Sequence, residues 1–409
     1  MASSLSIRHI RCLSTTITTT TTTSFSTISV SKAKSKLRSE HDPDKALEIY
    51  SSVSTHYTSP LSSRYTQDLT IKRLAKSKRF TDIESLLESH KKDPKITQEP
   101  FLSTLIRSYG LAGMLDHAIK TFDQMDELKT PRSATSFNAL LSACNLSKEF
   151  GKVPKLFDEI PKKYGFLPDK VSYGILVKSY CESGKVESAM EILKEMEEKK
   201  IEVTNVTFTT VLDALYKKDM VDEAEKLWNE MVKRGCELDV AAYNVRIMYA
   251  HGSGPENVQA LIDEMVAVGI KPDTIGYNYL MTSYCKSGKI DEAKKVYEDL
   301  ENMGLHANAA TYRTLVYYLC RNEDYERAYK VFKKSVEFHK IPDFGTLKFL
   351  VEGLVKKGNR KDAKGLIRTV KKKFPPSFLN AWKKVEVELG LVSESVSSDP
   401  VDVVQEATG

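Results

Sequence analysis

Apolar residues recur along most of this chain in blocks that repeat about every 35 positions. Segments begin at Lys170, Asn205, Thr274 and Ala309. The first two start 35 residues apart, and so do the last two. An aromatic residue occupies one fixed place in each segment (Tyr173, Phe208, Tyr277, Tyr312), and an alanine occupies another (Ala189, Ala224, Ala293, Ala328). A fixed period of this length is the sequence mark of a repeat architecture. The register extends from a weak unit near 64 to a unit at 344, with one deletion around Gly252–Pro255.

Each unit resolves into two amphipathic helices. In the unit from Thr274, the spacing places Ile275, Leu280, Met281 and Tyr284 on one apolar face. Gly288 is expected to take the positive φ of a helix end, and a second stripe then runs through Ala293, Val296, Tyr297 and Leu300. Because one hairpin cannot bury both stripes alone, neighbouring hairpins should stack into a continuous core.

The predicted fold is therefore all-α, a right-handed α-solenoid (superhelix) of about 8–9 helix-turn-helix repeats. We divide the chain into a targeting presequence (1–30), a degenerate N-terminal repeat (31–63), the repeat array (64–378), a capping helix (379–392) and an acidic tail expected to be disordered (393–409). The array units start near 64, 99, 134, 170, 205, 240, 274, 309 and 344.

The first residues have the composition of an organelle import signal. Arg8 and Arg11 precede a serine- and threonine-rich tract, and no acidic residue occurs before Glu40. A secretory signal would need a continuous apolar stretch, which this segment lacks. We expect import into mitochondria, with the plastid as the alternative. A disordered N-terminus without a targeting function is a third interpretation.

Composition and motifs argue against an enzyme. The formal net charge of +6 is a small excess for 409 residues, and the six cysteines form no CxxC pair and no zinc-ligand spacing with histidine. No GxxxxGK[ST] phosphate loop and no HxE with CxxC signature of a zinc deaminase occurs. No apolar run reaches the length of a membrane helix. We predict no catalytic residues, no metal and no cofactor, and no association with a membrane.

Several phrases narrow the repeat type. VTFTTVLDAL, IGYNYLMTSYCKSGKIDEA and the closing VGIKPD resemble the P-class pentatricopeptide repeats of plant organelles over about residues 64–378. A tetratricopeptide repeat would place a tryptophan in the first helix, whereas Trp228 falls in a second helix. The resemblance implies binding of single-stranded RNA, one base per repeat, read by two or three side chains.

The resemblance also implies which residues meet the RNA. The fifth residue of the first helix and the last residue of the repeat would read the base, and an apolar residue at the second place would lie between bases. The reading pairs are Asn138/Asp169, Thr209/Asp239, Asn244/Asp273 and Asn278/Asn308, and the base-sandwiching residues are Val171, Val206, Ala241 and Ile275. The family's rule then predicts U–x–G–U–Y from 5′ to 3′. The alternative is that the three asparagines only cap helices or fill turns.

Other positions depart from the family pattern. Gly174/Thr204 cannot supply the usual hydrogen bonds, and Arg313 and Lys348 place long cations where a small polar reader belongs. Basic residues also crowd the segment from Lys356 to Lys373. We predict phosphate contacts for Arg313, Lys348, Lys371, Lys372 and Lys373, since such a cluster can neutralise a nucleic-acid backbone. The alternative is a solvated polar cap on the solenoid.

Few standard reading pairs and a basic end are typical of the short P-class proteins associated with the small subunit of the mitochondrial ribosome. We therefore favour a component or factor of that subunit, with rRNA or mRNA and mitochondrial ribosomal proteins as partners. One alternative is a free, sequence-selective binder of single-stranded organelle transcripts, and another is a protein-binding helical scaffold. Outside a larger assembly we expect a monomer.

Overall fold

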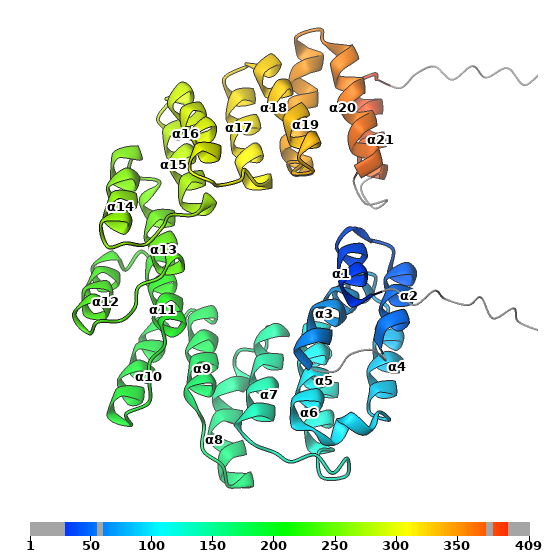
Figure 1. Ribbon diagram of the computed structural model, residues 1–409, viewed down its shortest axis with the longest axis vertical. Coiled ribbons are helices and arrows are strands. Elements are labelled where there is room, and N and C mark those ends of the chain that lie inside the picture. The colour runs from blue at the N-terminus through cyan, green and yellow to red at the C-terminus, as the bar shows by residue number, and fades with distance from the viewer. Residues whose placement is uncertain (1–28, 55–59, 374–378, 392–409) are drawn as a thin grey trace, which may run out of the picture. The chain divides into compact units, whose positions relative to one another are not determined.

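The computed structural model describes residues 29–54, 60–373 and 379–391, and within these ranges it is entirely helical (Figure 1). The expected presequence up to residue 28 and the acidic tail lie outside the described residues. The chain divides into two compact units, Met1–Pro131 and Arg132–Gly409. The prediction of an all-α fold built from helical hairpins is confirmed, whereas the right-handed sense of the superhelix stays a prediction.

The first unit contains three helical hairpins and one short 3₁₀ turn. Its elements are α1 (Val30–Ser39), α2 (Pro43–Ser54), α3 (Pro60–Lys76), α4 (Phe80–His90), η1 (Pro94–Thr97), α5 (Glu99–Leu111) and α6 (Leu115–Asp123). The Ser29 side chain accepts a hydrogen bond from the backbone N–H of Lys32 and so caps α1. Ala33 and Leu37 of this basic helix are fully buried where α1 packs against α2 and α3. Helix α1 is thus part of the packed unit.

The second unit contains seven hairpins followed by one single helix. The first helices of the hairpins are α7 (Ala134–Leu146), α9 (Lys170–Glu182), α11 (Asn205–Lys217), α13 (Val240–Ala250), α15 (Thr274–Lys286), α17 (Ala309–Arg321) and α19 (Phe344–Lys356). The second helices are α8 (Lys152–Tyr164), α10 (Val186–Glu198), α12 (Val221–Lys233), α14 (Pro255–Ala267), α16 (Ile290–Asn302), α18 (Tyr325–Glu337) and α20 (Arg360–Lys373), and α21 (Leu379–Glu388) follows.

Stacking in the second unit arranges these helices in two rows, which Figure 1 shows for the hairpins from α7 to α20. Each first helix packs against its own second helix and against the first helices of the neighbouring hairpins in this unit, and α9, α11, α15, α17 and α19 also pack against the preceding second helix. Helix α13 contacts the preceding second helix through the rings of Trp228 and Tyr243, whose centroids are 4.9 Å apart. The repeat-register alanines, such as Ala224, Ala293 and Ala328, are fully buried in the core between the rows. Three sides of each first helix are therefore covered, and one side remains, which we call the free face of the first-helix row.

The structure corrects one detail of the predicted packing. Ile275 is 48% exposed on the free face, whereas Leu280 and Met281 are buried. At 100° per residue, Ile275 lies on the opposite side of α15 from these two residues, so assigning it to their buried stripe was wrong. Other details are confirmed: Gly288 has φ +75°, and α13 has 11 residues where the other first helices have 13, at the position of the deletion.

The cysteines within the repeats are packing residues. Cys144, Cys285 and Cys320 are buried, and burial raises the pKa of the Cys144 thiol to about 11 and of the other two to about 12. Cys181 is half-buried, and burial raises the pKa of its thiol as well. Thiols in this state are protonated at neutral pH and unreactive. In the described ranges, no group of three or more His, Cys, Asp or Glu side chains is placed to hold a metal ion.

Candidate nucleic-acid interface

In the second unit, the residue that ends one repeat caps the first helix of the next hairpin. The side chain of Asp169 accepts a hydrogen bond from the backbone N–H of Ser172 (2.8 Å) at the start of α9. Asp239, Asp273 and Asn308 cap α13, α15 and α17 in the same way. Short polar side chains are the preferred N-caps because they satisfy N–H groups that have no partner inside the helix. The cap holds each of these side chains at the start of a first helix.

Stacking then brings the fifth residue of the preceding repeat to this cap. The Asn138 amide Nδ2 donates to Asp169 Oδ1 (3.0 Å), and Asn244 donates to Asp273 (3.1 Å). In the third such pair, Asn278 Nδ2 donates to Asn308 Oδ1 (3.2 Å). In each pair, the residue that caps the helix is the last residue of the repeat, and the asparagine bridges two neighbouring repeats. Three of the four predicted pairs are therefore joined directly.

A hydroxyl side chain from the next repeat, which the reading pattern does not include, fixes the orientation of the amide. Ser172 Oγ donates to Asn138 Oδ1 (2.6 Å), and Thr311 Oγ1 donates to Asn278 Oδ1 (2.7 Å). Both hydroxyls belong to the third residue of the next first helix. The equivalent residue beside Asn244 is Gly276, and the Asn244 Oδ1 atom is buried without a hydrogen-bond partner. The sequence signal for this contact is a serine or threonine at the third place of a first helix, between an apolar and an aromatic residue.

This geometry leaves a defined pair of groups for a ligand. An amide nitrogen has two N–H groups, and the bond to the cap uses one of them. The second N–H of Asn138 stays available as a donor, and the Asp169 carboxylate has further acceptor capacity beside it. A uracil edge offers the matching groups, an N–H between two carbonyl oxygens. The joined pairs can therefore discriminate bases by hydrogen bonding.

The Asp169 carboxylate is held ionised by its surroundings. Burial alone would raise its pKa, but hydrogen bonds from the backbone N–H of Ser172 and from the Asn138 amide outweigh this and hold the pKa below its ordinary value. At neutral pH the pair thus presents an amide donor next to a charged acceptor.

The pair Thr209/Asp239 is arranged differently. The Thr209 Oγ1 atom is buried without a hydrogen-bond partner, while Asp239 accepts from the backbone N–H of Ala242 (2.9 Å). At Gly174, an added Cβ would lie 3.2 Å from Thr207 Oγ1, so the first helix at this repeat runs close to its neighbour. Neither repeat has the amide bridge seen in the other three.

The predicted base-sandwiching residues line the free face beside the readers. Val206 is 73% exposed, Val171 is 52% exposed, and Ala241 is exposed as well. With Ile275 they place apolar surface at the second position of four successive first helices. Single exposed apolar residues are ordinary on protein surfaces, whereas a row in register is the pattern expected of a surface that contacts a ligand, and the base-sandwiching role stays a prediction.

The predicted phosphate contacts fall into different environments. Arg313 is exposed on the free face of α17 and makes no ion pair with a described residue. Lys348 lies 3.6 Å from Glu352 and 4.0 Å from Glu388, and Lys371 forms an ion pair with Glu386 of α21. Lys372 is exposed. The side chain of Lys373 lies outside the described residues.

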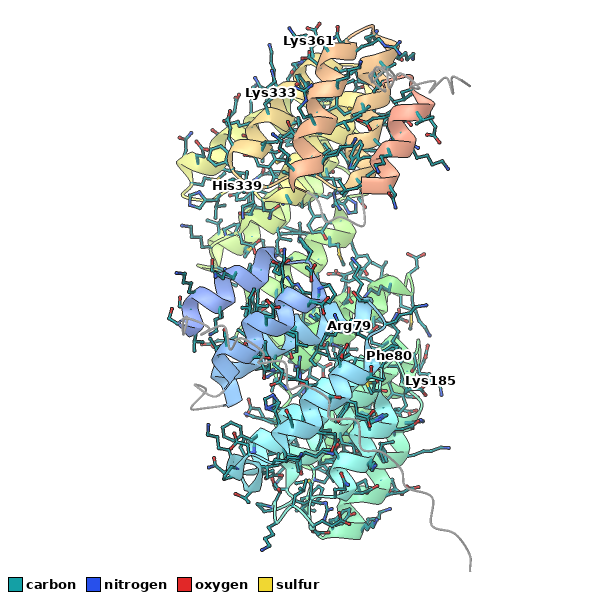
Figure 2. The ribbon with its side chains drawn as sticks, turned by 90° about the vertical axis from the view of Figure 1, so that its right-hand side faces the viewer. Arg79, Phe80, Lys185, Lys333, His339 and Lys361 are labelled. Atoms are coloured by element: carbon teal, nitrogen blue, oxygen red, sulfur yellow. The ribbon has the colours of Figure 1, made fainter. Side chains whose placement is uncertain are left out.

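The structure also groups four exposed cations on α20, which we call the cation row: Lys361, Lys364, Arg368 and Lys372. These residues lie on the side of the helix opposite the buried Ala363, Leu366, Ile367 and Val370. Figure 2 labels Lys361 of the cation row and Lys333 of α18. The Nζ atom of Lys333 lies 4.5 Å from the centre of the Tyr329 ring. None of the four makes an ion pair within the described ranges, so their charge is available to an anionic partner.

Comparison with known proteins gives consistent matches. The PPR repeat family model matches residues 168–217, 204–251 and 272–321, and the PPR repeat model matches 102–129, 135–164 and 310–339. The chain is 64% identical over 360 residues to the small ribosomal subunit protein mL103 (rPPR7) of Arabidopsis thaliana, covering 88% of this chain and 87% of that protein. It is 59% identical to a mitochondrial pentatricopeptide repeat-containing protein of the same plant, covering 88% and 85%.

Among solved structures, the chain is similar to the pentatricopeptide repeat protein PPR10 from maize. The match has a TM-score of 0.45 and 19% sequence identity, and it covers 88% of this chain and 60% of the maize chain. Within the described ranges, no helix combines the length and the hydropathy that crossing a bilayer requires.

Proposed function

Because this chain belongs to the pentatricopeptide repeat family, we propose that it is an RNA-binding component of the small subunit of the mitochondrial ribosome. The observation that carries this proposal is the 64% identity to a small ribosomal subunit protein over 88% of the chain. Another relative, which is 59% identical to this chain, is named a mitochondrial protein, and this supports the same compartment. The chain would act in translation, by binding rRNA or mRNA and neighbouring ribosomal proteins, without catalysing a reaction.

The interface geometry supports such a structural function. Three joined reading pairs, at about 1–3 kcal/mol of discrimination for each base, select weakly among the transcripts of an organelle. Contacts to the phosphate backbone supply affinity without sequence selection. The cation row of α20 and the exposed Arg313 offer such contacts on two different helices. A ribosomal component binds RNA at only one place in the subunit, and its contacts with the assembled subunit select that place without base reading.

Sedimentation tests this proposal. The tagged full-length chain is expressed in plant mitochondria, and gently prepared lysates are run on gradients at high magnesium and at low magnesium, where ribosomes dissociate. We expect the chain to sediment with ribosomes at high magnesium and with the small subunit at low magnesium. Sedimentation with the large subunit would refute the subunit assignment. Recovery near the top of both gradients would refute ribosome association altogether.

A second candidate is a free binder of single-stranded transcripts, which the direct bonds between readers and caps favour. A chain that sediments in RNase-sensitive particles of mixed size would support it. The sequence U–x–G–U–Y would then be the motif to search for among the bound RNAs.

A further inference from the structure

Helix α17 presents an unusual set of side chains on the free face. The exposed residues of this helix are Ala309, Arg313, Tyr317 and Arg321, which follow one another at four-residue intervals. Such spacing places them in one stripe along the helix. The remaining sides of α17 pack against α15, α16, α18 and α19. The stripe therefore faces the same surface as the readers and the exposed apolar row of the preceding repeats.

Tyr317 gives this stripe an aromatic centre. Its side chain is 40% exposed. The Phe349 ring of α19 lies 6.0 Å away at an interplanar angle of 56°, and the Tyr318 ring lies 5.1 Å away at 90°. Neither neighbour stacks in parallel on Tyr317. The two contacts fix the ring and leave aromatic surface open.

Two arginines flank the ring along the helix axis. Arg313 and Arg321 are each four residues from Tyr317, about 6 Å along the axis. Both are exposed, and neither forms an ion pair with a described residue. On the neighbouring helix α19, the carboxylate of Glu352 lies 3.6 Å from Lys348 Nζ. Its negative charge is therefore already balanced by that lysine. The net charge around the ring is therefore positive.

This repeat also lacks the amide bridge through which three other repeats can read a base edge. Arg313 stands at the reader position, and the cap Asp343 accepts from the backbone N–H and the hydroxyl of Thr346, both at 3.0 Å. No amide bridge is present. The surface that takes its place combines a flat ring with two flanking cations, a combination that suits a nucleotide whose base stacks and whose phosphates are neutralised.

We propose that Arg313, Tyr317 and Arg321 form a stacking site for one unpaired nucleotide of a bound RNA strand. The base lies on the Tyr317 ring, and the two guanidinium groups contact the phosphates on its 5′ and 3′ sides. The site accepts any base, since every base has a π-face. It continues the path of the strand beyond the reading pairs and adds affinity without selectivity. The inference rests on the proposed RNA binding.

Photocrosslinking with matched variants tests this site. The probes are single-stranded oligonucleotides containing UAGUU, with one 5-iodouridine at successive places 3′ of that sequence, because iodouracil crosslinks to stacked aromatic rings. We expect one probe to crosslink to Tyr317, as identified by mass spectrometry. Tyr317→Phe should keep the crosslink, and Tyr317→Leu should abolish it. Phe338→Leu removes an exposed ring that follows α18 and serves as the control.

Affinity provides a second readout. Tyr317→Leu should weaken binding of the same RNA roughly tenfold, the range of one base–aromatic stack, and Tyr317→Phe should change it little. If the wild-type chain binds the RNA, Tyr317→Leu binds it with the same affinity and the crosslinks form at other residues, the stacking site is overturned and the proposed function stands. A wild-type chain that binds none of the probes or rRNA, yet captures ribosomal proteins through the two arginines, would overturn both.

Discussion

Gly276 offers a direct test of how the reader amide is held. In two other repeats, a hydroxyl at this place, from Ser172 or Thr311, donates to the reader oxygen at 2.6–2.7 Å. At Asn244 the equivalent oxygen is buried without a partner, because Gly276 has no side chain to donate. We predict that Gly276→Ser supplies the missing hydrogen bond and stabilises the second unit.

The magnitude follows from two contributions. Replacing glycine by serine inside a helix gains about 0.5 kcal/mol from helix propensity, and satisfying a buried acceptor adds about 1 kcal/mol. The new Cβ would lie 3.6 Å from Ile247 Cδ1, an ordinary contact, and 3.3 Å from Asn244 Oδ1, a tight one that requires the amide to shift by a few tenths of an ångström. Serine and alanine share this contact, so it cancels in their comparison. Gly276→Ala has the same Cβ and the larger propensity gain, about 1 kcal/mol, without a hydroxyl. Alanine therefore isolates the hydrogen bond.

Urea unfolding of four variants measures that bond as a coupling free energy. Serine and alanine at 276 are compared in the presence of Asn244 and in the presence of Asn244→Ala. We expect the difference between serine and alanine to shift by about 1 kcal/mol in favour of serine when Asn244 is present. An equal difference in both backgrounds would refute the hydroxyl-to-amide bond, and with it the account of how the third residue orients the reader.

Three further predictions concern the bases, the phosphates and pH. Thr209→Asn should move the preference at the third base from G towards a pyrimidine by about fivefold or more, measured on RNAs that differ at that base; an unchanged preference would contradict the assignment. Changing all four residues of the cation row to glutamine should make the slope of log affinity against log salt concentration shallower by about 0.7–0.9 for each lost phosphate contact, equally for all RNAs. The control is Lys371→Gln, which should change the slope less because Lys371 is already paired with Glu386. Because the pKa of Asp169 is lowered in the folded state, its carboxylate contributes stability that is present above about pH 4 and is lost as the pH falls through the pKa of the folded state. Asp169→Asn should therefore lose less stability than the wild type between about pH 7 and pH 3. An equal drop in the urea midpoint of both proteins would show that this carboxylate does not contribute.

The sequence by itself determined the architecture and the register of the second unit. A period of 35 with a fixed aromatic and a fixed alanine places two helices in each repeat, since burying both stripes requires stacking with neighbours. The deletion near Gly252 and the positive φ of Gly288 followed from the same register, and the structure confirms both. Helix formation and hairpin stacking depend on short-range patterns, which one sequence displays in full.

Only the tertiary structure decided which side chains meet across repeats. Helix geometry alone places Ile275 opposite Leu280 and Met281, but only stacking decides which of the two sides of α15 is covered and which lies on the free face. The bridge from Asn138 to Asp169, with Ser172 holding the amide, joins residues that are 31 and 34 positions apart. The same holds for cations: Lys371 and Lys372 are adjacent in sequence, but folding α21 against α20 gives an acidic partner to the first and leaves the second exposed. Composition records how many charges a chain carries, whereas packing decides which of them remain available to RNA.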